Sequence, residues 1–314
     1  MIARAFWTVA AGQGEIRAED LPPPAEGERR VTALASGISR GTEATVFAGR
    51  VPESQYAVMR APLMGGDFPF PVKYGYAMVG DAEGARVFVL HPHQDVFNAP
   101  AAMCIPVPDA VPTRRAVLAA NMETAVNILW DAAPLPGERI AVIGAGVVGL
   151  LVGYLISHLP GTIATVIDVD PGREALARAL GCDFALPAAT PAECELIIHA
   201  SGNPAGLHAA LSQAAFEGRI VEASWYGDTS VTLPLGEHFH ARRLRLISSQ
   251  VGAVSSAMRG RRSYADRLGF ALSLLADSRL DALLGSVTRF DELPARMPTL
   301  LGGGLCHVVT YGEN

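Results

Sequence analysis

The amino-acid sequence predicts an α/β protein that combines a β-rich part with a doubly wound parallel sheet. Three observations lead to this class. Residues 1–20 alternate between apolar and polar positions, which is typical of strands with one buried face. Residues 140–149, IAVIGAGVVG, join a short apolar strand to a glycine turn and an apolar helix. Beyond Asp168, apolar runs of strand length alternate with helical patterns, which favours parallel strands joined by right-handed crossovers.

The chain is long enough for two domains with large cores, since it has 314 residues of which 50% are hydrophobic and 18% charged. Strand patterns dominate up to residue 113. There the pattern becomes helical, and Thr113 is the expected helix cap. We therefore place a domain boundary near residue 113. A second boundary is expected after the strand near residues 244–249, so that residues 251–314 return to the first domain.

The glycines of residues 140–149 fall in a G-x-G-x-x-G pattern, which indicates a dinucleotide-binding turn. At this spacing Gly144 permits the tight turn after the strand, Gly146 allows the backbone to approach a pyrophosphate, and Gly149 allows the helix to pack closely on the sheet. The pyrophosphate would lie at the N-terminus of the helix that begins with Val147 and Val148. There, free N–H groups and the helix dipole favour an anion.

Asp168 ends the next apolar run, at about the distance from the glycines where a ribose-binding acid is expected. A carboxylate at this point accepts hydrogen bonds from the ribose hydroxyls of NAD and repels the 2′-phosphate of NADP, so we predict NAD. NADP stays possible because Arg173 is near enough to contact a phosphate. Asp168 could alternatively be a strand-end carboxylate or a helix cap, although Asp170, which precedes Pro171, is the more expected cap.

Several motifs resemble the medium-chain dehydrogenase/reductase superfamily, and the resemblance covers most of the chain. They are SGISRGTE (36–43), VKYGYAMVG (72–80), NMETAVNIL (121–129) and IGAGVVG followed by VIDVD (143–149 and 166–170). The first is also similar to the bacteriochlorophyllide a dehydrogenase branch. The resemblance implies a GroES-like catalytic domain of residues 1–113 and 251–314, a Rossmann domain of residues 114–250, and NAD(P)-dependent oxidoreductase activity.

The departures from this superfamily concern zinc. Where its zinc enzymes have a cysteine ligand the chain has Ser39, and where they have histidine and glutamate it has Tyr76 and Ala77. A catalytic zinc needs about three protein ligands, typically Cys, His or carboxylate. No cysteine cluster follows Gly80 to form a structural zinc lobe, and the two histidines of H-P-H (91–93) are weak evidence for a metal. We therefore predict no zinc.

Without a metal, hydride transfer still needs a hydrogen-bond donor for the developing oxyanion and a path for the proton. Tyr76 is the first candidate donor, with a packed aromatic ring as the alternative. Lys73 either lowers the pKa of Tyr76 or is a surface lysine. Glu43 either orients its loop through Arg40 or forms a structural ion pair, and His93 is either a proton shuttle or structural. The candidate set expected to face the cleft between the domains is Tyr76, Ser39, Thr42, Glu43, Lys73 and His93.

Polar residues follow two predicted parallel strands at the ends where such sheets bind ligands. Thr124 resembles the superfamily threonine that lies near the nicotinamide, with helix packing as the alternative. Trp225 and Tyr226 are expected to wall the nicotinamide or the substrate, and Gln250 is a weaker candidate. The cofactor set is Gly144, Gly146, Val147, Val148, Gly149, Asp168, Thr124, Ser201, Gly202, Ser224 and Trp225.

Three functional hypotheses stay open at this point. The first is a zinc-independent dehydrogenase acting on an alcohol or carbonyl, the second a quinone or enone reductase, and the third a nucleotide-binding redox sensor or partner subunit without chemistry. The loss of the metal ligands favours the last two, whereas the polar loop Ser39 to Glu43 together with Tyr76 favours retained chemistry. We expect a small-molecule substrate and a homodimer.

Composition excludes other classes of partner. The net charge of −6 argues against nucleic acid, which requires a clustered basic surface. The uncharged run 140–157 contains four glycines and is better explained by a buried strand, turn and helix than by a membrane span. The four scattered cysteines suit free thiols in a reducing compartment, and the N-terminus lacks a signal-peptide pattern, so we expect a cytoplasmic protein.

Overall fold

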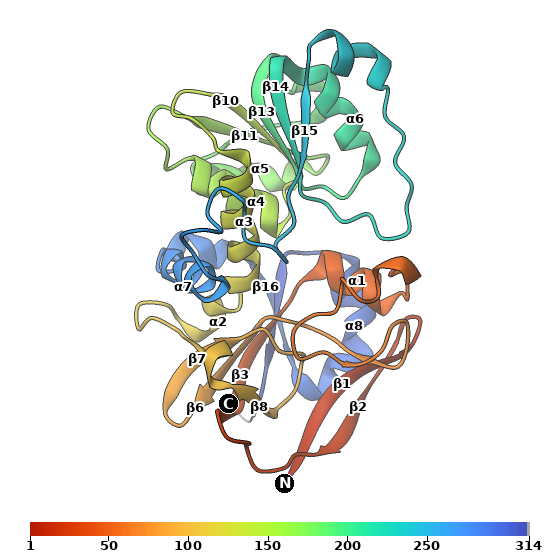
Figure 1. Ribbon diagram of the computed structural model, residues 1–314, viewed down its shortest axis with the longest axis vertical. Helices are drawn as coiled ribbons and strands as arrows, with labels where there is room; N and C mark the ends of the chain where they lie inside the picture. Colours follow the sequence, from red (N-terminus) through yellow and green to blue (C-terminus); the bar gives the residue numbers. More distant parts are fainter. Residues whose placement is uncertain (313–314) are drawn as a thin grey trace. The chain divides into compact units, whose positions relative to one another are not determined.

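The computed structural model describes residues 1–312 and consists of two compact units (Figure 1). One unit comprises Met1–Ala120 and Leu268–Asn314, and the other Asn121–Arg267. Residues 313 and 314, which close the predicted range 251–314, lie outside the described residues. The two units meet within two helices, α3 (Ala119–Ala132) and α7 (Tyr264–Leu274). The domain boundaries expected after residues 113 and 250 stay predictions.

The unit Asn121–Arg267 is built on a six-stranded sheet with the order β12-β11-β10-β13-β14-β15 (Figure 1). All neighbouring strands in it are parallel, and this order is that of a doubly wound dinucleotide-binding sheet. Its strands are β10 (Arg139–Ile143), β11 (Ile163–Ile167), β12 (Asp183–Ala185), β13 (Cys194–His199), β14 (Ala214–Glu222) and β15 (Arg245–Ser248). Its helices are α4 (Val147–Ile156), α5 (Glu174–Ala179) and α6 (Pro204–Gln213), with the single turns η3 (Pro171–Arg173), η4 (Pro187–Ala189) and η5 (Leu235–Phe239).

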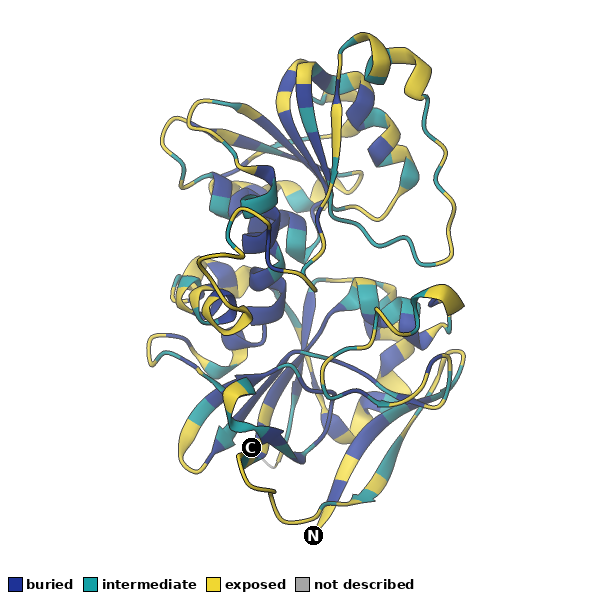
Figure 2. Ribbon diagram, in the orientation of Figure 1, coloured by how far each residue is buried: buried dark blue, intermediate teal, exposed yellow. Residues whose placement is uncertain are grey.

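The central strands β10 and β13 are apolar because both faces of this sheet are covered. Ile140, Val142, Ile197 and Ile198 are buried, and most of α4 is buried as well (Figure 2). Continuous apolar strands of this kind are expected when helices cover both faces of a parallel sheet. The predicted Rossmann-type sheet with helical crossovers is confirmed.

The other unit is β-rich and carries a four-stranded sheet, β2-β1-β5-β4, and a seven-stranded sheet, β16-β17-β3-β6-β7-β9, in which β8 also pairs with β3. Its main strands are β1 (Ile2–Ala10), β2 (Gln13–Asp20), β3 (Glu28–Ile38), β6 (Met78–Ala82), β7 (Ala85–Val89), β8 (Val96–Pro100), β16 (Leu284–Arg289) and β17 (Cys306–Thr310). Short strands are β4 (Gly65–Gly66), β5 (Val72–Lys73) and β9 (Ile105–Pro106). Its helices are α1 (Arg40–Phe47), α2 (Thr113–Ala116) and α8 (Leu293–Gly302), with the turns η1 (Glu53–Gln55), η2 (Ala101–Met103), η6 (Ser278–Leu283) and η7 (Phe290–Glu292).

The strand β3 organises this unit, since it pairs antiparallel with β17, β6 and β8. Its inward residues Val31 and Ala33 join a buried cluster with Phe97 and Val87. The hairpin of β1 and β2 confirms the alternating pattern at the N-terminus, because buried and exposed positions alternate at the start of β1. The C-terminal strand β17 pairs with β3 and so returns to this sheet.

Some local predictions are corrected by the structure. The predicted helix from Thr113 is two helices, α2 and α3, and its N-cap is Pro112, so Thr113 is the first helical residue and not the cap. The apolar pattern of AGLHAALSQAAF (205–216) predicts a helix up to residue 216, but α6 ends at Gln213 because Ala214 pairs with Cys194 in the sheet. Asp170 is confirmed as a cap, since its side chain accepts the N–H of Gly172.

Two further findings concern the chain as a whole. All four cysteines are free, as predicted, and the structure shows that all four are buried. Over residues 1–312, no helix has the length and apolar character that a membrane crossing needs.

Candidate active site

The glycine turn between β10 and α4 has the geometry that each glycine was predicted to provide. Gly144 has φ +109°, and a Cβ there would lie 2.7 Å from the Cα of Ser201. A Cβ on Gly149 would lie 1.9 Å from the carbonyl oxygen of Gly144, so helix and turn are in contact. A Cβ on Gly146 would meet nothing within 4 Å. Gly146 is the N-cap of α4, which starts with Val147 and Val148, and it faces open space where an anion can approach.

Asp168 follows β11 and is hydrogen-bonded to the glycine turn. Its Oδ2 accepts the N–H of Ala145 at 2.6 Å, and its Oδ1 accepts the N–H of Asp170 at 2.9 Å. The carboxylate is half-buried, and each oxygen retains capacity for a further hydrogen bond. Arg173, the predicted alternative phosphate contact, forms an ion pair with Asp170 at 3.3 Å. The acid at the strand end therefore both holds the turn and is available to a ribose.

Replacing Asp168 by serine is expected to change the choice between NADH and NADPH. The loss of a charged hydrogen-bond acceptor should raise the Kd for NADH by about tenfold, while relief of charge repulsion limits the loss for NADPH. Because Asp168 also holds Ala145, the measurement is the ratio of the two Kd values from fluorescence titration, which a loosened turn alone would not change. An unchanged ratio would remove Asp168 from the ribose site.

The other predicted cofactor residues of this sheet follow β13 and β14. The N–H of Gly202 donates to Ser224 Oγ at 3.0 Å, so the two strand ends are tied together. Ser201 and Gly202 are exposed, and Trp225 is half-buried in the segment after β14. Thr124 lies half-buried in α3, and Gln250 follows β15.

Two side chains at these strand ends were missed by the sequence reasoning. They are His199, which ends β13, and Glu222, which ends β14. The distance between His199 Nδ1 and Glu222 Oε2 is 2.8 Å. The signal was present, since each is a polar residue directly after an apolar run and before A-S, in IIHAS and IVEAS.

In the β-rich unit, the hydroxyl groups of three predicted catalytic residues, Tyr76, Ser39 and Thr42, lie close together. Tyr76 donates its O–H to Ser39 Oγ at 2.6 Å. Burial raises the pKa of Tyr76 to about 12, while hydrogen bonds with Ser39 and Thr42 act against this rise. The phenol is therefore protonated at neutral pH and can serve as a hydrogen-bond donor. Ser39 is the N-cap residue of α1, which places Thr42 one turn along the same helix.

Glu43 and His93 contact each other, and Glu43 also binds the backbone of Ser39 in this hydroxyl cluster. Glu43 Oε1 accepts the backbone N–H of Ser39 at 2.7 Å, and its Oε2 lies 3.0 Å from His93 Nε2. His93 Nδ1 lies 2.7 Å from Ser36 Oγ, which in turn lies 2.8 Å from the hydroxyl of Tyr311. Glu43 and His93 are 3% and 1% exposed. The predicted partner of Glu43, Arg40, is thus replaced by a histidine from a distant loop.

Lys73 is separate from the other predicted catalytic residues. Its Nζ forms an ion pair with Glu19 at 2.6 Å and a hydrogen bond with Gln94 at 2.9 Å. Its side chain is only 12% exposed, so it is not a surface lysine. The surface-lysine alternative is therefore corrected: Lys73 is an ion-pair partner between β5 and β2, and its effect on the pKa of Tyr76 stays a prediction.

His91 packs against Phe97, with ring centroids 3.6 Å apart. Burial lowers its pKa to about 3, so it is neutral. Across residues 1–312 there is no group of three His, Cys, Asp or Glu side chains placed to hold a metal ion.

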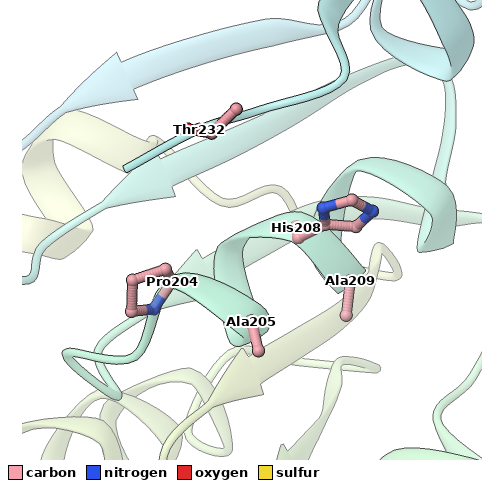
Figure 3. A pocket seen from close by; sticks show the side chains of 5 residues that line it. All are labelled: Pro204, Ala205, His208, Ala209 and Thr232. Atoms are coloured by element: carbon pink, nitrogen blue, oxygen red, sulfur yellow. The ribbon is translucent and has the colours of Figure 1, made fainter. Parts of the chain in front are cut away.

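A pocket lies on the surface beside α6. It is lined by Pro204, Ala205, His208, Ala209 and Thr232 (Figure 3). Of these only His208 carries an ionisable group, and none belongs to the predicted site. We assign it no role.

No protein-family model matches the chain. A curated relative, an uncharacterized zinc-type alcohol dehydrogenase-like protein of Haemophilus influenzae, is 24% identical over 216 residues, or 64% of this chain, and the match spans 59% of that relative. Among solved structures, an alcohol dehydrogenase of Escherichia coli CFT073 in complex with NADH superposes with a TM-score of 0.79 at 16% identity, covering 98% of this chain and 99% of that one. The chain has the medium-chain dehydrogenase fold.

The 2R,3R-butanediol dehydrogenase of Bacillus subtilis is also similar to this chain in fold. It superposes with a TM-score of 0.79 at 15% identity, covering 99% of this chain and 100% of that one. The predicted resemblance and its GroES-like plus Rossmann architecture are confirmed. Within the medium-chain dehydrogenase fold, the Rossmann domain corresponds to the unit with the glycine turn, and the GroES-like domain to the unit with Ser39 and Tyr76.

Proposed function

We propose that this chain is an NAD(P)-dependent oxidoreductase that transfers hydride between the nicotinamide and an alcohol or carbonyl substrate without zinc. The observation that carries the proposal is the hydrogen bond between Tyr76 and Ser39. By resemblance, these residues stand where the zinc enzymes of the superfamily have metal ligands, and the Tyr76 O–H donates a hydrogen bond to Ser39 Oγ. The relative from Haemophilus and the NADH complex from Escherichia coli support the oxidoreductase class.

The nucleotide site of this proposal is the glycine turn. The residues present fit a dinucleotide, since Gly146 faces open space at the start of α4 and Asp168 stands at the end of β11. When bound, the nicotinamide supplies or accepts the hydride. The turn and Asp168 bind the pyrophosphate and the ribose, and NAD is the proposed cofactor, with NADP as the alternative.

The residues do not fit a catalytic zinc. Hydroxyl groups that keep their protons are poor zinc ligands compared with thiolate, imidazole or carboxylate. Two groups of that kind near the pair, Glu43 and His93, are hydrogen-bonded to each other and to Ser39 and Ser36. We therefore derive no step through a metal.

In the proposed mechanism the hydroxyl pair polarises the substrate oxygen. The Tyr76 O–H donates to Ser39 Oγ in the structure, and a substrate oxygen that gains negative charge would accept a hydrogen bond from this hydroxyl pair. Glu43 fixes the pair by holding the backbone N–H of Ser39, and His93 fixes Glu43. Glu43 and His93 are thus positioning residues, because neither contacts the proposed substrate oxygen.

Metal independence is expected in the purified protein. Elemental analysis should give well below one zinc per chain, and activity should persist after dialysis against a chelator. As the matched assay, activity is measured again after zinc is added back to the chelated protein, where no increase is expected. Tight zinc at one per chain that is lost together with activity would contradict the proposal.

Two expectations about partners remain part of the proposal. The substrate is a small molecule, to be found by screening alcohols and carbonyls with both nucleotides. A homodimer is supported by the exposed edge strand β15, whose Leu246 is 40% exposed. Nucleotide binding without turnover of any alcohol, carbonyl, quinone or enone would instead favour a non-catalytic sensor or partner subunit.

A further inference from the structure

A strand, a serine and a helix follow one another at the carboxyl end of β13. β13 ends at His199, Ser201 comes two residues later, and α6 begins at Pro204. Gly202 makes the turn with φ +67°. A serine on a sharp turn between a parallel strand and a helix is presented to solvent, as in the nucleophile turn of the α/β-hydrolases.

Behind this serine lie a histidine and a carboxylate at hydrogen-bond distance. Glu222 Oε2 is 2.8 Å from His199 Nδ1, and His199 Nε2 is 2.6 Å from Ser201 Oγ. His199 is fully buried, whereas Ser201 is exposed. A carboxylate on Nδ1 holds the proton there, so that Nε2 is left to accept the proton of the serine hydroxyl. This is the order of groups that activates a serine nucleophile.

The surrounding backbone fixes this arrangement. His199 and Glu222 are direct neighbours in the parallel register of β13 and β14. Glu222 also accepts the Tyr226 O–H at 2.9 Å and the Ser224 N–H at 2.7 Å. A Cβ on Gly206 would lie 2.7 Å from His199 Nε2, so the glycine on α6 makes room for the ring. The imidazole is therefore held on both of its nitrogens.

We propose that Ser201 is a nucleophile that takes acyl groups from activated esters. Ser201 Oγ attacks the acyl carbon while His199 Nε2 takes the serine proton. The ester C–O bond breaks, and the leaving alcohol carries that proton away. Water then attacks the acyl-serine, its proton passes to His199, and the acid and free Ser201 are released. The N-terminal end of α6, close to Ser201, favours the negative charge that develops. This activity requires neither nucleotide nor the proposed oxidoreductase reaction.

The test uses the purified full chain, without nucleotide, and two probes: p-nitrophenyl acetate and a fluorophosphonate. We expect one fluorophosphonate adduct per chain, mapped by mass spectrometry to the peptide that contains Ser201, and steady release of p-nitrophenol. Both are lost in Ser201→Ala. Glu222→Gln and His199→Gln should slow both reactions by about 100-fold or more, because general-base assistance is removed.

Ser212→Ala is the matched control, since Ser212 is an exposed serine on α6 that bonds only to the carbonyl oxygen of Ala209. Its rates should equal those of the wild type. Mapping the adduct on the wild-type chain needs no variant to fold, and heat-denatured protein should not react. An adduct on another residue, no adduct at all, or full hydrolysis by Ser201→Ala would overturn the proposal. Because nucleotide is omitted, failure here leaves the proposed dehydrogenase function unaffected, and the reverse holds as well.

Discussion

Tyr76→Phe should lower turnover by roughly 100-fold, about 3 kcal/mol of transition-state stabilisation, while leaving the fold intact. The change removes the O–H that donates to Ser39 Oγ at 2.6 Å and keeps the ring that packs edge-on against Tyr74, with centroids 6.0 Å apart. Affinity for NADH should be nearly unchanged, because Tyr76 and the glycine turn belong to different units of the chain. The measurement is kcat with the best substrate from an alcohol and carbonyl screen, beside the NADH Kd.

Tyr74→Phe is the matched control for this experiment. Its hydroxyl reaches only the carbonyl oxygen of Met59 at 3.5 Å, and its turnover should stay within about twofold of the wild type. Ser39→Ala should resemble Tyr76→Phe, and the double variant should lose little more than either single variant if the two hydroxyls act as one unit. Full turnover in Tyr76→Phe would return Tyr76 to a packing role, with Ser39 and Thr42 as the next positions to vary.

The parts of the fold that depend on local sequence were predictable. Apolar runs such as residues 140–143 and 163–167 became parallel strands because their flanking segments formed helices long enough to cross back over the sheet. The glycine turn was predictable because two of its demands are local: Gly144 has a positive φ, and a Cβ on Gly149 would meet the carbonyl oxygen of Gly144. The ends of helices were less predictable: α6 stops where Ala214 finds a partner strand, which no local signal reveals.

The site was predictable as a set of residues but not as a set of contacts. Ser39 and Tyr76 were paired only through resemblance to a superfamily, and the structure then gives them a direct hydrogen bond. Glu43 was matched with its neighbour in sequence, Arg40, yet its partner is His93, fifty residues away along the chain. The contact of His199 with Glu222 depends on the register between two strands, which a single sequence does not specify.

Gly149→Ala and Gly146→Ala should give opposite results, although both add one methyl group to the same turn. At Gly149 the new Cβ would lie 1.9 Å from the carbonyl oxygen of Gly144, a backbone atom that cannot rotate away. Helix α4 must then shift on the sheet, and we expect the free energy of unfolding to fall by about 3 kcal/mol or more. Denaturant unfolding followed by circular dichroism measures this loss, and a wild-type midpoint would show that turn and helix are not in close contact.

Gly146→Ala should fold normally but bind nucleotide poorly. Gly146 has φ −75° and ψ 178°, which alanine adopts without strain, and its added Cβ would meet nothing within 4 Å of the chain. Stability should therefore stay within about 1 kcal/mol of the wild type. The methyl group does, however, enter the space at the start of α4 where the pyrophosphate is proposed to lie, so the Kd for NADH should rise by about tenfold or more. Wild-type NADH affinity in this variant would mean that the pyrophosphate does not lie over Gly146.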